Sequence, residues 1–174
     1  MPDPAKEDYK ICVDVQYADL TAKVAGVLFR DWADPQPIHE ITISTAVLAE
    51  YEPGAFYKRE LPCILELLAQ LPTTPALIII DGYVWLGHER PGLGYHLFTA
   101  LEGKVPVIGV AKNHFHGIDD ACALLRGTSQ RPLFVTSEGM DAGEAMRGIE
   151  AMHGAHRVPT LIKRADQLCR ADSP

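Results

Sequence analysis

The chain has 174 residues, of which 47% are hydrophobic and 22% are charged, and this length and composition predict one globular domain spanning residues 1–174. The formal net charge of −7 argues against a protein that binds nucleic acid through one broad basic face, because that mode depends on clustered lysine and arginine. A narrow cleft that binds nucleic acid beside bound cations is compatible with this charge.

The sequence shows neither a secretory signal nor a stretch of about twenty apolar residues. Its four cysteines are widely spaced and form no zinc-binding pattern; they are Cys12, Cys63, Cys122 and Cys169. We therefore expect a cytoplasmic, monomeric protein without membrane contact, whose cysteines are reduced packing residues.

The chain begins with three segments rich in valine, isoleucine and threonine, at residues 10–17, 22–31 and 38–48. Apolar and polar residues partly alternate in them, and polar or proline-containing turns separate them, which is typical of β-strands. Consecutive strands joined by short turns favour an antiparallel meander.

Helices and strands are predicted to alternate after the meander. Leucines near helical spacing predict a helix over residues 62–71, with Pro62 in its first turn. Further helices are predicted near 92–101, 119–127 and 141–154 and after Pro159, and further strands at 76–82, 106–112 and 132–139. This order predicts an α/β fold, a ribonuclease-H-like mixed sheet covered by helices.

Charged residues lie at or inside the most apolar segments of the chain. Asp14 lies in ICVDVQY, Asp81 follows LIII and Lys112 follows VIGVA. A buried unpaired charge is strongly unfavourable unless a partner or a metal compensates it. Together with Glu60 in YEPGAFYKRELP, these residues predict an acidic cation site with a lysine beside it, which suits phosphodiester chemistry.

The predicted topology places the strands of Asp14, Asp81 and Lys112 side by side and parallel, so that their carboxyl ends meet. Two neighbouring carboxylates repel each other unless a divalent cation neutralises both. Mg²⁺ suits this site because it prefers oxygen ligands, and Mn²⁺ is an acceptable substitute. We expect the Lys112 amine within about 6 Å of the two aspartates, and Arg59 and Arg90 at the rim of the cleft. The alternative is that the aspartates only cap strand ends or pair with basic side chains.

Six segments of the chain resemble, in order, those of the endonuclease V family. They are VDVQYAD, YEPGAFYKRELP, IIIDG with HERPGLGYH, VPVIGVAKNHFHG, PLFVTSEGM and RVPTLIKRADQL. The resemblance covers nearly the whole chain, from about Lys10 to Cys169. The resemblance implies a metal-dependent repair endonuclease that hydrolyses a phosphodiester on the 3′ side of deoxyinosine in DNA, or of inosine in RNA. The implied products are a 3′-hydroxyl and a 5′-phosphate.

The resemblance also implies roles for individual residues. Asp14, Glu60 and Asp81 would bind the catalytic Mg²⁺, with Asp166 contributing to the same site. Lys112 would contact the scissile phosphate or the attacking water. The remaining implied contacts are with substrate: Tyr51, Pro53 and Gly54 as a wedge that fills the gap left by an extruded base, Gly82 in the base pocket, and Arg59 and His88 near the phosphates or behind the metal ligands.

The sequence departs from the family pattern after Asp81. Members usually show D-G-x-G-x-x-H-P-R, whereas DGYVWLGHER lacks the second glycine, has Glu89 in place of proline and places His88 one residue further along. The segment before the first strand is also shorter than is usual in the family. These departures and the acidic charge leave two alternatives open: a catalytically diverged nucleic-acid-binding module of the same fold, and another Mg²⁺-dependent nuclease with this fold.

Overall fold

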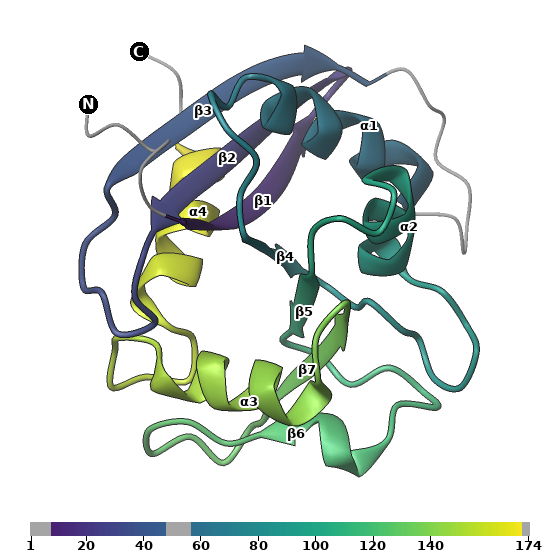
Figure 1. Ribbon diagram of the computed structural model, residues 1–174, viewed down its shortest axis with the longest axis vertical. Coiled ribbons are helices and arrows are strands. Elements are labelled where there is room, and N and C mark those ends of the chain that lie inside the picture. Colours follow the sequence, from purple (N-terminus) through teal and green to yellow (C-terminus); the bar gives the residue numbers. More distant parts are fainter. Residues whose placement is uncertain (1–7, 48–56, 172–174) are drawn as a thin grey trace.

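A computed structural model describes residues 8–47 and 57–171 of the chain, and a seven-stranded sheet runs through this part (Figure 1). The strand order is β3-β2-β1-β4-β5-β7-β6. The strands are β1 (Lys10–Ala18), β2 (Thr21–Phe29), β3 (His39–Ala46), β4 (Leu77–Asp81), β5 (Val107–Ala111), β6 (Ala123–Leu124) and β7 (Leu133–Glu138). The helices are α1 (Tyr57–Ala69), α2 (Leu93–Ala100), α3 (Ala142–Ala151) and α4 (Thr160–Arg170), with a short 3₁₀ helix η2 (Asp120–Cys122).

The first three strands form the predicted antiparallel meander. β1 and β2 pair from Lys10 opposite Phe29 to Ala18 opposite Thr21, so only two residues make the turn between them. One of these, Asp19, adopts a left-handed backbone conformation with a φ of 55°, which aspartate tolerates better than most residues. β3 pairs with β2 in the same antiparallel manner. The prediction for this part of the sheet is confirmed.

The centre of the sheet is parallel, as predicted from the sequence. β4 pairs in parallel with β1, with Val13 opposite Ile80, and β5 pairs in parallel with β4, with Asp81 opposite Val110. The carboxyl ends of β1, β4 and β5 therefore lie along one edge of the sheet, where ligands bind in open α/β folds.

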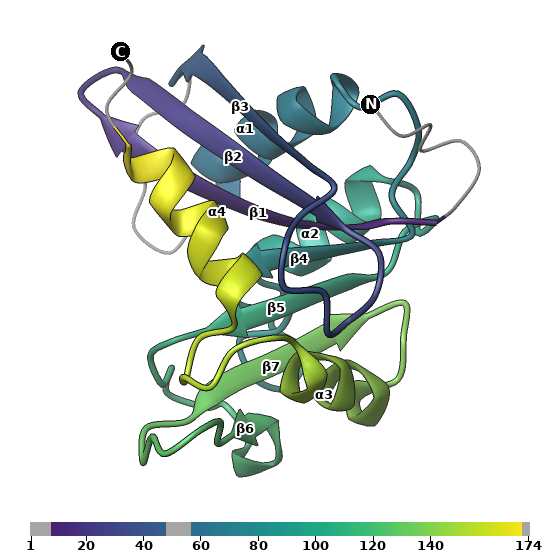
Figure 2. The same ribbon diagram turned by 90° about the vertical axis from the view of Figure 1, so that its left-hand side faces the viewer.

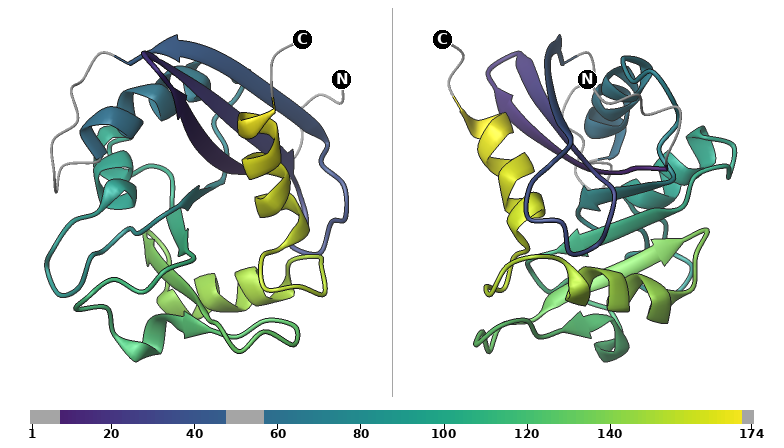
Figure 3. Two further views of the ribbon diagram at one scale, coloured as in Figure 1. Left: turned by 180° about the vertical axis from the view of Figure 1, so that it is seen from behind. Right: turned by 60° about the vertical axis from the view of Figure 1, so that its left-hand side comes forward.

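Helices cover both faces of the sheet (Figure 2). α1 and α2 pack on one face, in a core that contains Ile78 and Ile80, and α3 and α4 pack on the other, in a core that contains Leu77 and Ile79. These pairs alternate because successive side chains of a strand point to opposite faces. α4 lies across β1 and β2 (Figure 3), which brings the last helix of the chain over the first strand.

Two details of the predicted elements are wrong. Pro62 lies inside α1 rather than in its first turn, because the helix already includes Tyr57. Residues 119–127 form no regular α-helix. Asp119 accepts a hydrogen bond from the backbone N–H of Ala121 and starts a 3₁₀ turn, after which β6 pairs with β7. Pairing with an open strand edge therefore outweighs the helical pattern of this segment. Since no crossover helix forms there, β7 runs antiparallel to β5.

All four cysteines are free thiols, and three of them are buried, in agreement with their predicted packing role. Within residues 8–47 and 57–171, no helix has both the length and the apolar character needed to span a lipid bilayer.

Candidate metal centre

Three charged side chains predicted from the sequence lie where the parallel pairing of β1, β4 and β5 ends, with Asp14 in the middle of the longer β1. In the parallel ladder Asp14 follows the pair of Val13 and Ile80, so Asp14 and Asp81 are neighbours. Lys112 is the first residue after β5. The charge of Lys112 lowers the pKa of both aspartates, against their burial, so its ammonium acts on the same site.

Glu60 reaches this edge from α1, on the opposite face of the sheet. It is only 8% exposed, and it lines a small cavity together with Asp14 and Asp81. A larger cleft of about 420 Å³ is lined by Glu60, Asp81 and Lys112 among other residues. The helix and the parallel strands thus bring Glu60, Asp81 and Lys112 to one cleft, and Asp14 lines the small cavity that shares Glu60 and Asp81 with it.

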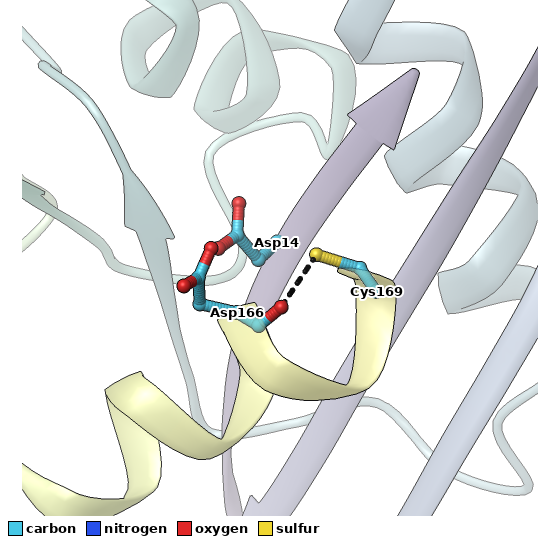
Figure 4. Close-up of side chains that lie close together, drawn as sticks. All are labelled: Asp14, Asp166 and Cys169. Carbon is cyan, nitrogen blue, oxygen red and sulfur yellow. Dashed lines mark hydrogen bonds between the residues drawn. The ribbon is translucent and has the colours of Figure 1, made fainter. Parts of the chain in front are cut away.

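Asp166 reaches the site from α4 (Figure 4). The side chains of Asp14, Asp166 and Cys169 point toward one another, and one potential metal-binding atom of each lies within 4.8 Å of the others. Arg170, one turn after Asp166, donates a hydrogen bond of 2.7 Å to its carboxylate. Asp14 therefore lies between two neighbours: the pair of Glu60 and Asp81, and Asp166.

Burial and mutual repulsion alter the ionisation of these carboxyl groups. Burial, followed by the charges of Asp81 and Asp166, raises the pKa of Asp14 to about 7. Burial, followed by the charges of Asp81 and Asp14, raises the pKa of Glu60 to about 8. Burial also raises the pKa of Asp81, which remains open to solvent at the mouth of the cleft. Asp166 differs, because the hydrogen bond from Arg170 and the charge of Lys112 outweigh its burial and lower its pKa.

These residues fit a divalent cation. The four carboxylates supply the oxygen ligands that Mg²⁺ and Mn²⁺ prefer. Burial first, and the neighbouring acids second, raise the pKa values of Asp14 and Glu60, so their charged forms are poorly compensated in the metal-free protein. A bound divalent cation would supply the missing charge.

Two arginines lie near the cleft against aromatic rings. The guanidinium carbon of Arg59 is 4.5 Å from the ring centroid of Tyr17, and its charge lowers the pKa of Glu60 against the effect of burial. The guanidinium carbon of Arg90 is 5.6 Å from the ring centroid of Phe115. The guanidinium groups themselves contact the rings, which holds two positive charges near the carboxylates.

A further cavity of about 270 Å³ adjoins the carboxylates. Its walls include Glu60, Asp81, Gly82, Tyr83, Leu86, Arg90, Pro91, Gly92, Leu93 and Phe115. Gly82 has a φ of 127°, a backbone conformation that side-chain-bearing residues rarely adopt, and its N–H donates to the carbonyl of Val110. The chain therefore turns sharply away from β4 at Gly82 and forms one wall of an apolar cavity beside the acids.

The structure places His88 apart from this group. His88 is exposed and lines a separate cavity of about 510 Å³ with Trp85, Gly87 and Glu89. Gly87 has a φ of 113° and Glu89 a φ of 59°, so the loop turns twice around His88. This is the loop in which the sequence places His88 one residue further from Asp81. Tyr51, Pro53 and Gly54 lie outside the described residues.

Sequence reasoning missed three residues around the carboxylates. Tyr17 ends the VDVQY segment, and its buried hydroxyl has no hydrogen-bond partner among residues 8–47 and 57–171. Phe115 forms part of the 270 Å³ cavity, and Cys169 adjoins Asp14 and Asp166. Only Cys169 had a usable signal, since it lies three residues after Asp166 and so on the same face of a helix.

Comparison with known proteins identifies the family of this chain. The family profile described as Endonuclease V matches residues 2–125. The endonuclease V of Streptomyces avermitilis is 35% identical to this chain over 179 aligned residues, covering 91% of this chain and 77% of the relative. The chain belongs to the endonuclease V family. It is therefore a nuclease, and endonuclease V enzymes are metal-dependent.

Solved structures of endonuclease V share the fold. The crystal structure of the Streptomyces avermitilis enzyme has a TM-score of 0.73 at 32% identity and covers 94% of this chain and 80% of its own. A Ciona intestinalis endonuclease V, solved with a 23-mer DNA containing an inosine followed by a ribo-adenosine, has a TM-score of 0.78 at 18% identity, covering 95% of this chain and 85% of its own. The ribonuclease-H-like fold predicted from the sequence is confirmed.

Proposed function

We propose that this endonuclease V, a single-domain monomer, hydrolyses a phosphodiester bond on the 3′ side of inosine in DNA or RNA, with Mg²⁺ as its natural cation. The observation that supports this most directly is the convergence of Asp14, Glu60 and Asp81 from three different elements, with Lys112 beside them. Binding alone does not require paired acids, so this arrangement favours catalysis over a binding module.

The carboxylates would hold the cation, which when bound polarises the phosphate and lowers the pKa of a coordinated water. Asp14 and Glu60 give up their protons as the cation binds, because only the ionised carboxylates are ligands. Asp166, whose pKa is already lowered, would contribute an oxygen from the α4 side. The ammonium of Lys112 would offset the negative charge that develops on the phosphate as the 3′ oxygen leaves.

The 270 Å³ cavity is our candidate for the base pocket. Backbone around Gly82 would approach the base edge, and Leu93 and Phe115 would contact its faces. Hypoxanthine lacks the exocyclic amine of guanine, so a pocket without room or an acceptor for that amine would reject guanine. Tyr51, Pro53 and Gly54 are proposed as the wedge that fills the gap left by the base. Arg59 and Arg90 are proposed to contact neighbouring phosphates. His88 lines a separate cavity, so it would contact a phosphate only if the nucleic-acid strand also passes that cavity.

The test is cleavage of matched oligonucleotides with one inosine or one adenosine, as DNA and as RNA. With Mg²⁺ or Mn²⁺ the inosine substrates should be cut to products with a 3′-hydroxyl and a 5′-phosphate, and EDTA should stop the reaction. Equal cleavage of the adenosine controls would contradict the base assignment. Binding of inosine substrates without cleavage under any metal would favour the diverged module instead.

A further inference from the structure

Arg157 makes an unusual set of contacts in the loop between α3 and α4. Its guanidinium Nη2 donates to the backbone carbonyls of Lys112 and Pro132, the latter at 2.8 Å, and its Nε donates to the carbonyl of Arg131 at 3.0 Å. One side chain thus links three segments that are far apart in the sequence. Because a guanidinium is planar and carries several fixed donors, it holds these carbonyls in a defined arrangement.

These contacts lie where the ladder between β5 and β7 ends. The last pair is Ala111 opposite Phe134, and Lys112 and Pro132 lie just beyond it. Pro132 has no backbone N–H, so this strand cannot donate a further ladder hydrogen bond at that position. The Arg157 guanidinium supplies donors to the carbonyls at both strand ends instead.

The backbone of Lys112 is therefore fixed by a residue outside its own strand. The next residue is also held, because the hydroxyl of Tyr83 donates a hydrogen bond of 2.5 Å to the carbonyl of Asn113. Arg157 also lies three residues before α4, which carries Asp166. The same guanidinium thus connects the lysine of the cleft with the helix that brings the fourth carboxylate.

We propose that Arg157 is a positioning residue for phosphodiester cleavage, which aims the Lys112 ammonium at the reacting phosphate and keeps α4 in place beside it. The inference rests on the proposed function in one respect: the cleavage assay uses the inosine substrate that the proposed function names. A displaced lysine would lose most of its effect in the transition state, where charge on the phosphate is greatest, and little in ground-state binding.

The test compares Arg157→Lys with Arg126→Lys. Arg126 is the control, because it is buried and its side chain binds the same loop by a different route. It donates to the carbonyls of Met152, Gly154, His156 and, at 3.4 Å, Arg157, but within the described residues it donates to none at the end of β5. Arg157→Lys should lower the single-turnover cleavage rate at saturating enzyme about 10-fold or more. Binding of the inosine oligonucleotide, measured with Ca²⁺ in place of Mg²⁺, should stay within roughly twofold of the wild type. Arg126→Lys should lower the melting temperature without lowering the cleavage rate below that temperature.

A double-mutant cycle tests the route of the effect. If Arg157 acts through Lys112, Arg157→Lys should slow the Lys112→Ala variant little further, whereas additive losses would overturn the proposal. Equal effects of Arg157→Lys and Arg126→Lys on rate would also overturn it. So would failure of both Arg157→Lys and Arg157→Gln to fold while Arg126→Lys folds, since Arg157 would then be needed for the fold itself.

Amide hydrogen exchange provides a readout that needs no substrate. Arg157→Lys should speed exchange across residues 112–115 selectively, and Arg126→Lys should not. A wild-type protein that cleaves no inosine substrate would refute the proposed function, and the exchange result would then decide the role of Arg157 alone. Unchanged exchange across residues 112–115 would refute that role.

Discussion

Glu60 and Asp14 have acid groups that the fold keeps partly protonated near neutral pH. Burial and neighbouring charges raise their pKa values to about 8 and about 7. Large pKa shifts are common at functional sites, because binding a ligand requires charged groups to be buried or close together even where this destabilises the free protein. In the proposed function, a cation bound between the carboxylates would recover the free energy that their burial and mutual repulsion cost.

Replacing Asp81 by asparagine tests this view of the carboxylates. Asp81→Asn should reduce cleavage by at least about 100-fold, because the cation loses a charged ligand. In EDTA the same variant should melt at a higher temperature than the wild type, since the charge of Asp81 is the largest electrostatic contribution that raises the pKa of Glu60. Cleavage assays and thermal melts measure the two effects. Asp31→Asn, at an exposed position, should change neither, and an Asp81→Asn variant with normal cleavage would disprove the catalytic role.

The buried hydroxyl of Tyr17 allows a second test, paired with Tyr9. Tyr17→Phe removes a buried hydroxyl that has no hydrogen-bond partner in the described part of the chain, so the free energy of unfolding should stay equal or rise by up to about 1 kcal/mol. Tyr9→Phe removes a hydroxyl that donates to the carbonyl of Thr73 and should destabilise by about 1 kcal/mol. Urea denaturation measures both. A clear loss of stability in Tyr17→Phe would show that its hydroxyl has a partner in solution.

The residues that could be predicted from the sequence differ from those that could not in how unusual their side chains are for their surroundings. Asp14, Asp81 and Lys112 were predictable because a charge inside an apolar strand calls for a partner. Tyr17 and Phe115 were not, because an aromatic residue in or after a strand looks the same whether it fills the core or lines a cavity. Arg157 was quoted within a motif, but its contacts with carbonyls at two strand ends depend on tertiary structure.

At the scale of elements, the site depends on how closely the loop after β4 approaches β5. A Cβ atom added to Gly109 would lie 2.6 Å from the carbonyl oxygen of Gly82 and 2.8 Å from the backbone nitrogen of Val84. This loop is also anchored on β7, where the N–H of Val84 donates to the hydroxyl of Thr136. The wall of the proposed base pocket is thus built directly on the sheet.

Gly109→Ala should therefore damage stability and the base pocket together. Because the added methyl meets backbone atoms that cannot rotate away, we expect a loss of about 1–3 kcal/mol in the free energy of unfolding and a lower preference for inosine over guanosine. Gly143→Ala, in α3, is the control: its Cβ would meet only the ends of Asp141 and Arg147 side chains, and it should stabilise by up to about 1 kcal/mol. Denaturation curves and competition cleavage measure the effects. Unchanged base preference in Gly109→Ala would separate this loop from base recognition.

Most elements were predictable because their patterns agree with their final environment. The meander and the parallel strands show apolar runs bounded by turns, and both lie in the predicted order. The exception at residues 119–127 arises because the edge of β7 is available for pairing, and Leu124 becomes buried there. Nothing local in the sequence shows that a strand edge will be free, so this choice is made by the assembled sheet.

For the whole molecule, the raised pKa values of Asp14 and Glu60 make the stability of the metal-free protein depend on pH. Asp14 and Glu60 bind protons more tightly in the folded than in the unfolded chain, where their pKa values return to 3.8 and 4.5. Unfolding therefore releases protons across the range between the ordinary carboxyl values and about 8. By linkage, the stability of the metal-free protein must fall as pH rises through this range, the opposite of the usual behaviour of a paired carboxylate.

We expect the free energy of unfolding in EDTA to decrease by an amount on the order of 5 kcal/mol between about pH 5 and about pH 8.5. Added Mg²⁺ should stabilise the protein strongly at the upper end of this range and little at the lower end, because protons compete with the cation for the same oxygens. Denaturation at a series of pH values, with EDTA and with Mg²⁺, measures both trends. Burial lowers the pKa of His96, so this residue makes stability increase with pH in the range below its ordinary pKa of 6.5. The Asp14→Asn/Glu60→Gln double variant retains that contribution and Asp81, whose pKa is also raised, so it should lose most of the decline with pH, and it should also lose the response to Mg²⁺. A wild-type protein whose metal-free stability rises from about pH 5 to about pH 8.5 would show that these carboxyl groups are not crowded together in solution.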